Sequence, residues 1–159
     1  MKVLHIDSSI MGDASVSRQL SQAIVAQLKE KYPDATVAGI SPNLSNLESV
    51  RNAFREAASK YGCIDILVNN AGVCRLGNFL DMSDEDRDFH IDINIKGVWN
   101  VTKAVLPEMI ARKDGRIVMM SSVTGDMVAD PGETAYALSK AAIIGLTKSL
   151  AVEYAQSGI

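Results

Sequence analysis

The 159-residue chain has the length of one domain, and its 47% hydrophobic and 22% charged residues are typical of a globule with a single core. Its net charge is −3 without a basic cluster, so we expect neither nucleic acid nor an anionic membrane as a partner. No apolar run approaches the roughly 20 residues that span a bilayer, and the first residues lack the pattern of a signal peptide. The two cysteines and two histidines are scattered, which predicts no metal site and a reducing, cytoplasmic setting.

Short β-rich segments alternate with long helical ones, which predicts βα units around a parallel sheet. The first strand is expected over residues 3–7, followed by a loop over residues 8–15. A helix then runs to about Lys31, where Pro33 ends it. The second strand is expected over residues 36–40.

The second helix begins near Ser45-x-x-Glu48, which has the pattern of a capping box. Its apolar residues follow the helical period: Leu47, Val50, Phe54, Ala57 and Tyr61. Gly62 is expected to close the helix because glycine reaches positive φ without strain. The third strand, residues 64–69, is continuously apolar, as in a sheet that is covered on both faces.

The pattern Ser83-x-x-Asp86 predicts the start of a short helix. The remaining elements are a helix from about Asp92 to Arg112, a strand over residues 116–121 and a helix from about Thr134 to Gln156. Pro107 is expected to kink the first of these helices without ending it, because the apolar period continues beyond it.

These elements predict one α/β domain over residues 1–159. We expect a three-layer sandwich with a parallel sheet of four βα units in the strand order 2-1-3-4, a hybrid of the flavodoxin-like and Rossmann-like folds. Ligands of such sheets bind beyond the carboxyl ends of the strands, at the switch point between the first and third strands. The loops after the strands are therefore the segments that should carry a site.

The loop after the first strand places hydroxyls and free amides at a helix N-terminus, where they stabilise a phosphate. A simpler interpretation is that Ser15 or Ser17 only caps the helix. The segment KVLHIDSSIMGDASVSRQLS resembles the start of FMN-dependent quinone reductases of the azoreductase type. The resemblance covers about the first 40 residues and implies an FMN phosphate site at Ser9, Ser15, Val16 and Ser17. Because Gly12 stands alone, G-x-G-x-x-G is absent and a dinucleotide is expected to fit this loop poorly.

Four motifs follow in the rest of the chain: Asn69-Asn70-Ala71-Gly72, Asn94 in INIKG, Ser122 in MSSV, and Tyr136-x-x-x-Lys140. By these motifs, residues 45–159 resemble the short-chain dehydrogenase/reductase family. The resemblance implies a nicotinamide cofactor, NAD or NADP, at Asn70, Ala71 and Gly72. It implies catalysis by a second set: Asn94, Ser122, Tyr136 and Lys140. It also implies a homodimer through the helices over residues 92–112 and 134–156.

The proton-transfer chemistry follows from the residue types. Tyr136 and Lys140 are four residues apart, so they share one helix face. An ammonium beside a phenol stabilises the phenolate, which lets the tyrosine exchange a proton near neutral pH while hydride moves. Ser122 would hydrogen-bond the substrate oxygen and Asn94 would hold a water that reaches Lys140. A lone Y-x-x-x-K pair is more often a surface helix pair, and the order of all four motifs is what favours shared ancestry.

Several features depart from that family and favour a protein without efficient turnover. The glycine-rich phosphate loop is absent, and residues 39–42 offer neither an acid for a ribose diol nor a base for a 2′-phosphate. The chain also stops at Ile159, where the family continues, and we expect the cofactor to be left uncovered. The leading hypothesis is a chimera, flavodoxin-like over residues 1–40 and dehydrogenase-like over residues 41–159, that binds phosphate, FMN or a nucleotide weakly. The alternatives are an NAD(P)-dependent oxidoreductase acting on a carbonyl or alcohol, and an FMN-binding protein.

Overall fold

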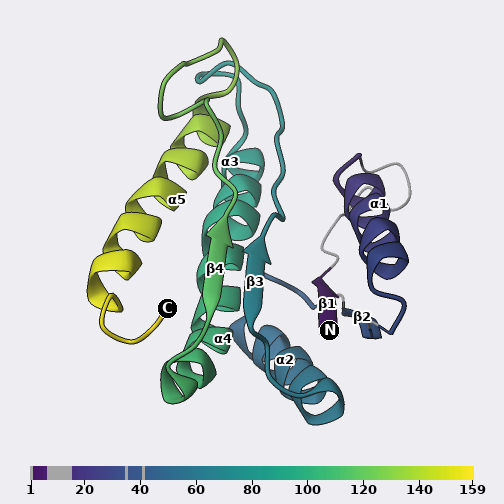
Figure 1. The fold of residues 1–159 in the computed structure, drawn as a ribbon. Coiled ribbons are helices and arrows are strands. Elements are labelled where there is room, and N and C mark those ends of the chain that lie inside the picture. Colours follow the sequence, from purple (N-terminus) through teal and green to yellow (C-terminus); the bar gives the residue numbers. More distant parts are fainter. Residues whose placement is uncertain (1, 7–15, 35, 41) are drawn as a thin grey trace.

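The structure is a computed structural model that describes residues 2–6, 16–34, 36–40 and 42–159 (Figure 1). Its elements are β1 (Lys2–Ile6), α1 (Val16–Lys31), β2 (Thr36–Ile40), α2 (Leu47–Tyr61), β3 (Ile66–Asn69), α3 (Asp84–His90), η2 (Ile91–Gly97), α4 (Val98–Arg112), β4 (Arg116–Met119) and α5 (Thr134–Glu153). The predicted strands and helices are present in the predicted order. The helix predicted from about Asp92 is divided into η2 and α4, and the other ends differ from the predicted ends by three residues or fewer. The α/β class of the prediction is confirmed.

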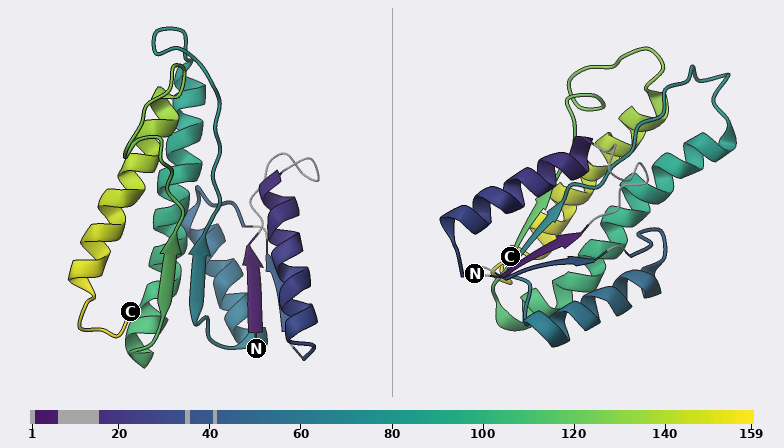
Figure 2. Two further views of the ribbon diagram at one scale, coloured as in Figure 1. Left: turned by 45° about the horizontal axis from the view of Figure 1, so that its top comes forward. Right: turned by 90° about the vertical axis from the view of Figure 1, so that its right-hand side faces the viewer.

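The strands pair in parallel, β1 with β2 and β3 with β4. Among the described residues these ladders form two separate two-stranded sheets. Figure 2 (right) places β1 and β2 between α1 on one side and α2 on the other, as in a layered α/β fold. Two of the three pairings in the order 2-1-3-4 are therefore present, and the pairing of β1 with β3 stays a prediction.

The hydrophobic core lies where α2 and α4 pack together and against β3. Its buried members are Leu44, Val50, Phe54, Leu67, Val101, Val105 and Met109. Three of the five apolar positions predicted for α2 are buried, Val50, Phe54 and Ala57. The helical period of the sequence thus identified the packed face of α2.

The ends of α2 confirm one expectation and correct another. Gly62 follows the helix with φ 84°, a conformation that favours glycine, and its N–H donates to the carbonyl of Ala58. The capping box at Ser45 was wrong: Asn46 is the N-cap, and its side chain accepts from the N–H of Ser49. Ser45 Oγ instead donates to Asn43 Oδ1 at 2.8 Å, because the chain turns just before the helix.

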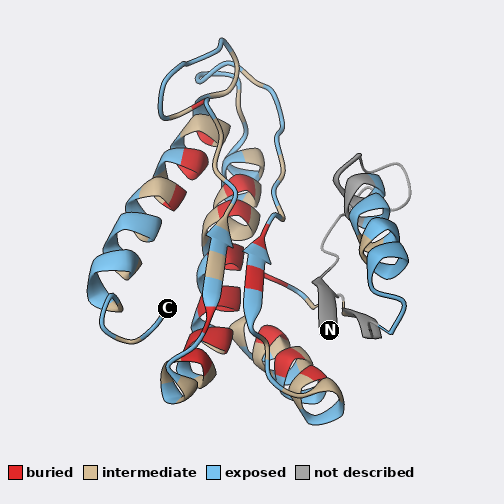
Figure 3. Ribbon diagram, in the orientation of Figure 1, coloured by how far each residue is buried: buried red, intermediate tan, exposed pale blue. Residues whose placement is uncertain are grey.

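The strands β3 and β4 are covered mainly from one side, which corrects the expectation of burial on both faces. Leu67 and Asn69 are buried, whereas Ile66 is 64% and Val68 52% exposed. Val118 on β4 is 44% exposed, and Figure 3 shows the same alternation along both strands. The period of two along a strand separates the face that packs on α4 from the open face.

A nearly continuous helical rod of α3, η2 and α4 carries the chain from residue 84 to residue 112. Ser83 caps it by accepting from the N–H of Asp86, as predicted. Within the rod, η2 is a π-helical stretch, a wider turn that recurs at functional sites. Pro107 lies inside α4 and does not end it, as predicted, and the kink expected there stays a prediction.

Helix α5 packs against η2 and β4 on the same side of the molecule as α4 (Figure 1). By length and composition alone it could cross a membrane, with 22% of that window buried. This is weak evidence, because core helices of soluble proteins pass the same test. Its position places Tyr136 and Lys140 beyond the carboxyl ends of the strands.

Candidate active site

A cleft of about 250 Å³ lies beyond the carboxyl ends of β3 and β4. Its lining comes from three segments: Asn70, Gly72, Val73 and Cys74 after β3, Met120 and Ser121 after β4, and Tyr136 and Lys140 on α5. Ligands of parallel sheets bind in this position, because the loops after neighbouring strands converge there. Four residues of the predicted site, Asn70, Gly72, Tyr136 and Lys140, are thus brought together.

Lys140 is the central charge of this cleft. The residue is 5% exposed, and its Nζ donates to the backbone oxygen of Met120 at 2.8 Å. Burial lowers the pKa of the Lys140 ammonium below its ordinary value of 10.5. The ammonium lies 5.7 Å from the centroid of the Tyr136 ring, as expected of side chains one helical turn apart.

Gly72 is needed for the close approach of the β3 loop to this lysine. A Cβ atom at Gly72 would lie 3.2 Å from Lys140 Nζ and 3.5 Å from Asn94 Oδ1. A side chain there would push the ammonium aside or narrow the cleft. The close contact with Lys140 and Asn94 therefore explains why the N-N-A-G motif has a glycine at this position.

Asn94 holds the wall of the cleft in place. It is fully buried, in the π-helical turn of η2. Its Oδ1 accepts from the N–H of Val73 at 2.8 Å, and its Nδ2 donates to the Val73 oxygen at 2.9 Å and to Ser139 Oγ at 2.9 Å. The side chain thus joins the loop after β3 to α5, and its water-holding role stays a prediction.

Ser122 lies beside the cleft without being part of its lining. It is partly buried, and its Oγ accepts from the N–H of Thr124 at 3.2 Å. Because that bond uses only a lone pair, the hydroxyl hydrogen is left to donate. The neighbouring Ser121 lines the cleft, and its hydroxyl donates to the backbone oxygen of Lys140 at 2.8 Å.

Sequence reasoning missed two buried residues that support the site. Ser139 is 1% exposed; it accepts from Asn94 and donates to the Tyr136 oxygen at 2.7 Å. His90 is fully buried, and its Nε2 accepts from the N–H of Arg75 at 2.9 Å. Their spacing was the available signal, since His90 precedes Asn94 by one helical turn and Ser139 precedes Lys140 by one residue.

The proposed phosphate site of the first loop is not tested by the structure. Ser9 and Ser15 lie outside the described residues, and Val16 and Ser17 are the first two residues of α1. Within the part of the chain that the structure describes, no three His, Cys, Asp or Glu side chains gather as metal ligands do. Burial and then the nearby Glu133 charge raise the pKa of the Cys74 thiol, which opposes a reactive thiolate.

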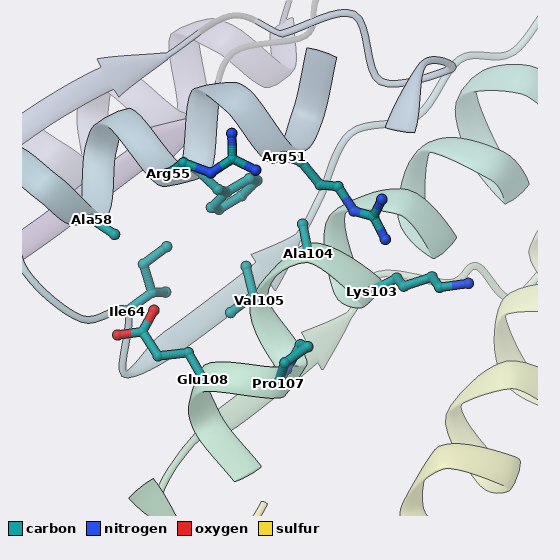
Figure 4. A pocket seen from close by; sticks show the side chains of 10 residues that line it. Arg51, Arg55, Ala58, Ile64, Lys103, Ala104, Val105, Pro107 and Glu108 are labelled. Atoms are coloured by element: carbon teal, nitrogen blue, oxygen red, sulfur yellow. The ribbon is translucent and has the colours of Figure 1, made fainter. Parts of the chain in front are cut away.

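A second cleft, of about 360 Å³, lies between α2 and α4 (Figure 4). Its rim carries Arg51, Arg55 and Lys103, and its floor is apolar. Arg51 is paired with Glu48 at 2.8 Å, and Arg55 donates to Asn52 at 3.0 Å, so both guanidinium groups already have partners on their own helix. Of the described residues that line this cleft, none belongs to the predicted catalytic or cofactor-binding set.

Comparison with known proteins places most of the chain in one family. The short chain dehydrogenase family matches residues 8–159. The oxidoreductase UcpA of Escherichia coli strain K12 is 88% identical over 111 residues, which are 70% of this chain and 42% of that protein. The 3-oxoacyl-[acyl-carrier-protein] reductase FabG of Staphylococcus aureus strain Mu50 is 38% identical over 143 residues, 90% of this chain and 57% of that protein. The chain thus spans about half the length of these relatives.

Solved structures agree with this assignment. A gluconate 5-dehydrogenase from Burkholderia cenocepacia J2315, solved in complex with NADP and tartrate, superposes with a TM-score of 0.79 at 29% identity, over 98% of this chain and 57% of that chain. The apo form of LigO from Sphingobium sp. strain SYK-6 superposes with a TM-score of 0.82 at 29% identity, over 100% of this chain and 55% of that chain.

These comparisons correct the leading hypothesis from the sequence. The family match begins at residue 8 and so includes most of the segment that resembles azoreductases. The comparisons give no support to a flavin-reductase origin of residues 1–40. They favour the oxidoreductase alternative over a chimeric scaffold. The chain belongs to the short-chain dehydrogenase family.

Proposed function

We propose that the chain carries the catalytic cleft of an NAD(P)-dependent oxidoreductase that interconverts a carbonyl compound and an alcohol. The observation that carries this proposal is the cleft in which Tyr136 and buried Lys140 face the loop that Asn94 ties to α5. The solved relative that contains NADP and the relatives named as a reductase and an oxidoreductase support the same activity.

In the direction of reduction, NAD(P)H would supply the hydride that bonds to the carbonyl carbon. The Tyr136 hydroxyl transfers its proton to the carbonyl oxygen, which becomes the alcohol. The Lys140 ammonium stabilises the phenolate that remains, and its low exposure strengthens that attraction. Ser122 donates its free hydroxyl hydrogen to the same substrate oxygen as charge develops there.

The donors of the cleft suit the ribose and nicotinamide half of the cofactor. Lys140 Nζ uses one N–H on Met120, and an ammonium has three, so two remain for ribose hydroxyls. Gly72 leaves room for this approach, because a Cβ atom at that position would lie 3.2 Å from Lys140 Nζ. We also propose that β1 lies beside β3, in the strand order 2-1-3-4. This order would bring the loop after β1 to the other end of the cofactor.

A binding titration tests the cofactor class. NADH, NADPH and FMN are each added to the purified chain, and binding is followed by ligand fluorescence. We expect a nicotinamide cofactor to bind, and Gly72→Val to weaken that binding at least tenfold. Gly77→Ala, whose Cβ atom would make only ordinary contacts with Met82, should leave the binding unchanged. Binding of FMN alone would contradict the proposal and return support to the flavin interpretation.

We also propose a homodimer through the helices over residues 92–112 and 134–156. Apolar side chains on these helices are open to solvent: Trp99 is 53%, Leu138 57% and Val152 82% exposed. Burying such residues against a second copy stabilises an assembly in proportion to the apolar area removed from water.

A further inference from the structure

The loop after β3 is held by two side chains that lie one turn apart on the same helical rod. Asn94 binds both backbone groups of Val73, and His90 accepts from the N–H of Arg75 at 2.9 Å. His90 and Asn94 lie about one turn apart on the rod, at the start of the π-helical η2, and their partners Arg75 and Val73 lie two residues apart in the loop. The rod can therefore bind alternate residues of the loop with successive turns.

The hydrogen bonds fix the state of the His90 ring. A backbone N–H can only donate, so Nε2 must be the accepting nitrogen of a neutral imidazole. The proton is then on Nδ1, which donates to the backbone oxygen of Asp86 at 2.7 Å. The ring is fully buried, so neither nitrogen contacts solvent. Each nitrogen instead has a backbone partner.

The side chain of Arg75 also contacts the rod. Its guanidinium carbon lies 3.9 Å from the centroid of the Phe89 ring, and Nη1 forms a 2.6 Å ion pair with Asp86 Oδ1. These contacts are at the surface, since the side chains of Arg75 and Asp86 are 49% and 37% exposed. The hydrogen bond from the Arg75 N–H to His90 is part-buried, and its acceptor belongs to a fully buried ring. Removing that acceptor leaves the Arg75 N–H without this partner, which costs free energy wherever water cannot replace it.

We propose that His90 is a positioning residue that fixes the loop wall of the cleft, and through it the binding of the nicotinamide cofactor. Gly72, Val73 and Cys74 line the cleft directly before Arg75, so a displacement of Arg75 is transmitted to that wall. His90 is not among the described residues that line the cleft, so we expect its effect to be on cofactor binding and not on the proton transfer. The expected change in KM rests on the proposed function. The hydrogen bond by which His90 holds the loop after β3 does not depend on that function.

Three substitutions separate positioning from a general contribution to folding. His90→Gln keeps an oxygen near the place of Nε2, His90→Asn keeps a polar group near Nδ1 but does not reach Arg75, and His90→Leu keeps the volume alone. For Leu and Asn we expect the KM for NADPH or NADH to rise about fivefold to tenfold, the effect of one lost hydrogen bond. We expect kcat to stay within about threefold of the parent. The Gln variant should restore the parent KM, whatever the order of the three melting temperatures.

Hydrogen exchange at the Arg75 amide gives a readout that needs no activity. We expect slow exchange in the parent and in His90→Gln, and fast exchange in His90→Asn and His90→Leu, each measured below its own melting temperature. Equal Arg75 exchange in all four proteins, a KM that Gln does not restore, or a loss confined to kcat would overturn the inference. If the parent binds no nicotinamide cofactor, the proposed function fails, and the exchange pattern still decides whether His90 holds the loop.

Discussion

Asn94 and Ser139 are joined by a hydrogen bond of 2.9 Å between the amide Nδ2 and the hydroxyl Oγ, and both side chains are buried. Through this bond the π-helical turn of η2 is tied to α5, beside Tyr136 and Lys140. Helix α5 and the loop after β3 are thus held by one pair of polar side chains. Because both side chains are buried, losing Ser139 would leave one N–H of the Asn94 amide without this acceptor.

Ser139→Ala removes the acceptor for Asn94 and the donor to the Tyr136 oxygen. We expect the free energy of unfolding to fall by about 1–3 kcal/mol, the effect of leaving a buried donor unpaired. Urea denaturation measures this change. Ser149→Ala, an exposed position on the same helix, serves as the control and should change stability by less than about 0.5 kcal/mol. Equal effects of the two substitutions would show that the buried bond contributes nothing.

Lys140 should make stability depend on alkaline pH. Burial lowers its pKa below 10.5, so between that lowered pKa and 10.5 the folded chain releases the proton while the unfolded chain still holds it. The unfolded state then binds more protons, and stability rises with pH in this window. We expect the parent to gain stability relative to Lys140→Met as the pH approaches 10.5, measured by urea denaturation at several pH values. A difference between the two that is independent of pH would contradict the lowered pKa.

Gly115 lies against the fully buried Met109. A Cβ atom at Gly115 would lie 2.5 Å from Met109 Sδ and 2.8 Å from Met109 Cβ, too close for the side chain to yield at its tip alone. We expect Gly115→Ala to destabilise the chain by about 1–3 kcal/mol. Gly77→Ala is the matched substitution, because its Cβ would meet only ordinary contacts of 3.5 Å or more. Thermal melts that show the same shift for both variants would refute the steric argument.

The dimer proposal predicts a change of assembly from one substitution on α5. Leu138→Glu places a charge on an exposed apolar position of that helix, and burying this charge against a second copy would be unfavourable. We expect light scattering to give a dimer mass for the parent and a monomer mass for this variant. Leu80→Glu, at a 92% exposed position before α3, should leave the dimer intact. A monomeric parent at micromolar concentrations would rule out the proposed assembly.

The elements of the fold were predictable because each left a local pattern. The period of α2 identified Val50 and Phe54 as core residues, and Ser83 and Gly62 marked helix ends by their capping chemistry. The open face of β3 was not predictable, since Ile66 and Val68 are apolar whether or not a layer covers them. Propensity along one strand does not report which neighbours pack on it.

Some residues of the candidate site were also predictable from the sequence, and others were not. Tyr136 and Lys140 were predictable from their spacing on one helix, and the carboxyl ends of β3 and β4 predicted where the cleft lies. His90 and Ser139 were missed because their roles depend on contacts with residues 15 and 45 positions away in the sequence. The resemblance of the first 40 residues to azoreductases led to the chimera hypothesis, because a short serine-rich loop before a helix is compatible with more than one ancestry.

The proposal that Tyr136 transfers a proton during hydride transfer is tested most directly by turnover. The parent and Tyr136→Phe are mixed with NADPH or NADH and a panel of ketones and aldehydes, and the loss of the reduced cofactor is followed at its absorbance maximum. The account predicts cofactor oxidation by the parent that depends on the carbonyl compound. It also predicts that Tyr136→Phe reduces kcat by about 10²-fold or more, with cofactor binding unchanged. Turnover of Tyr136→Phe at the rate of the parent would contradict it.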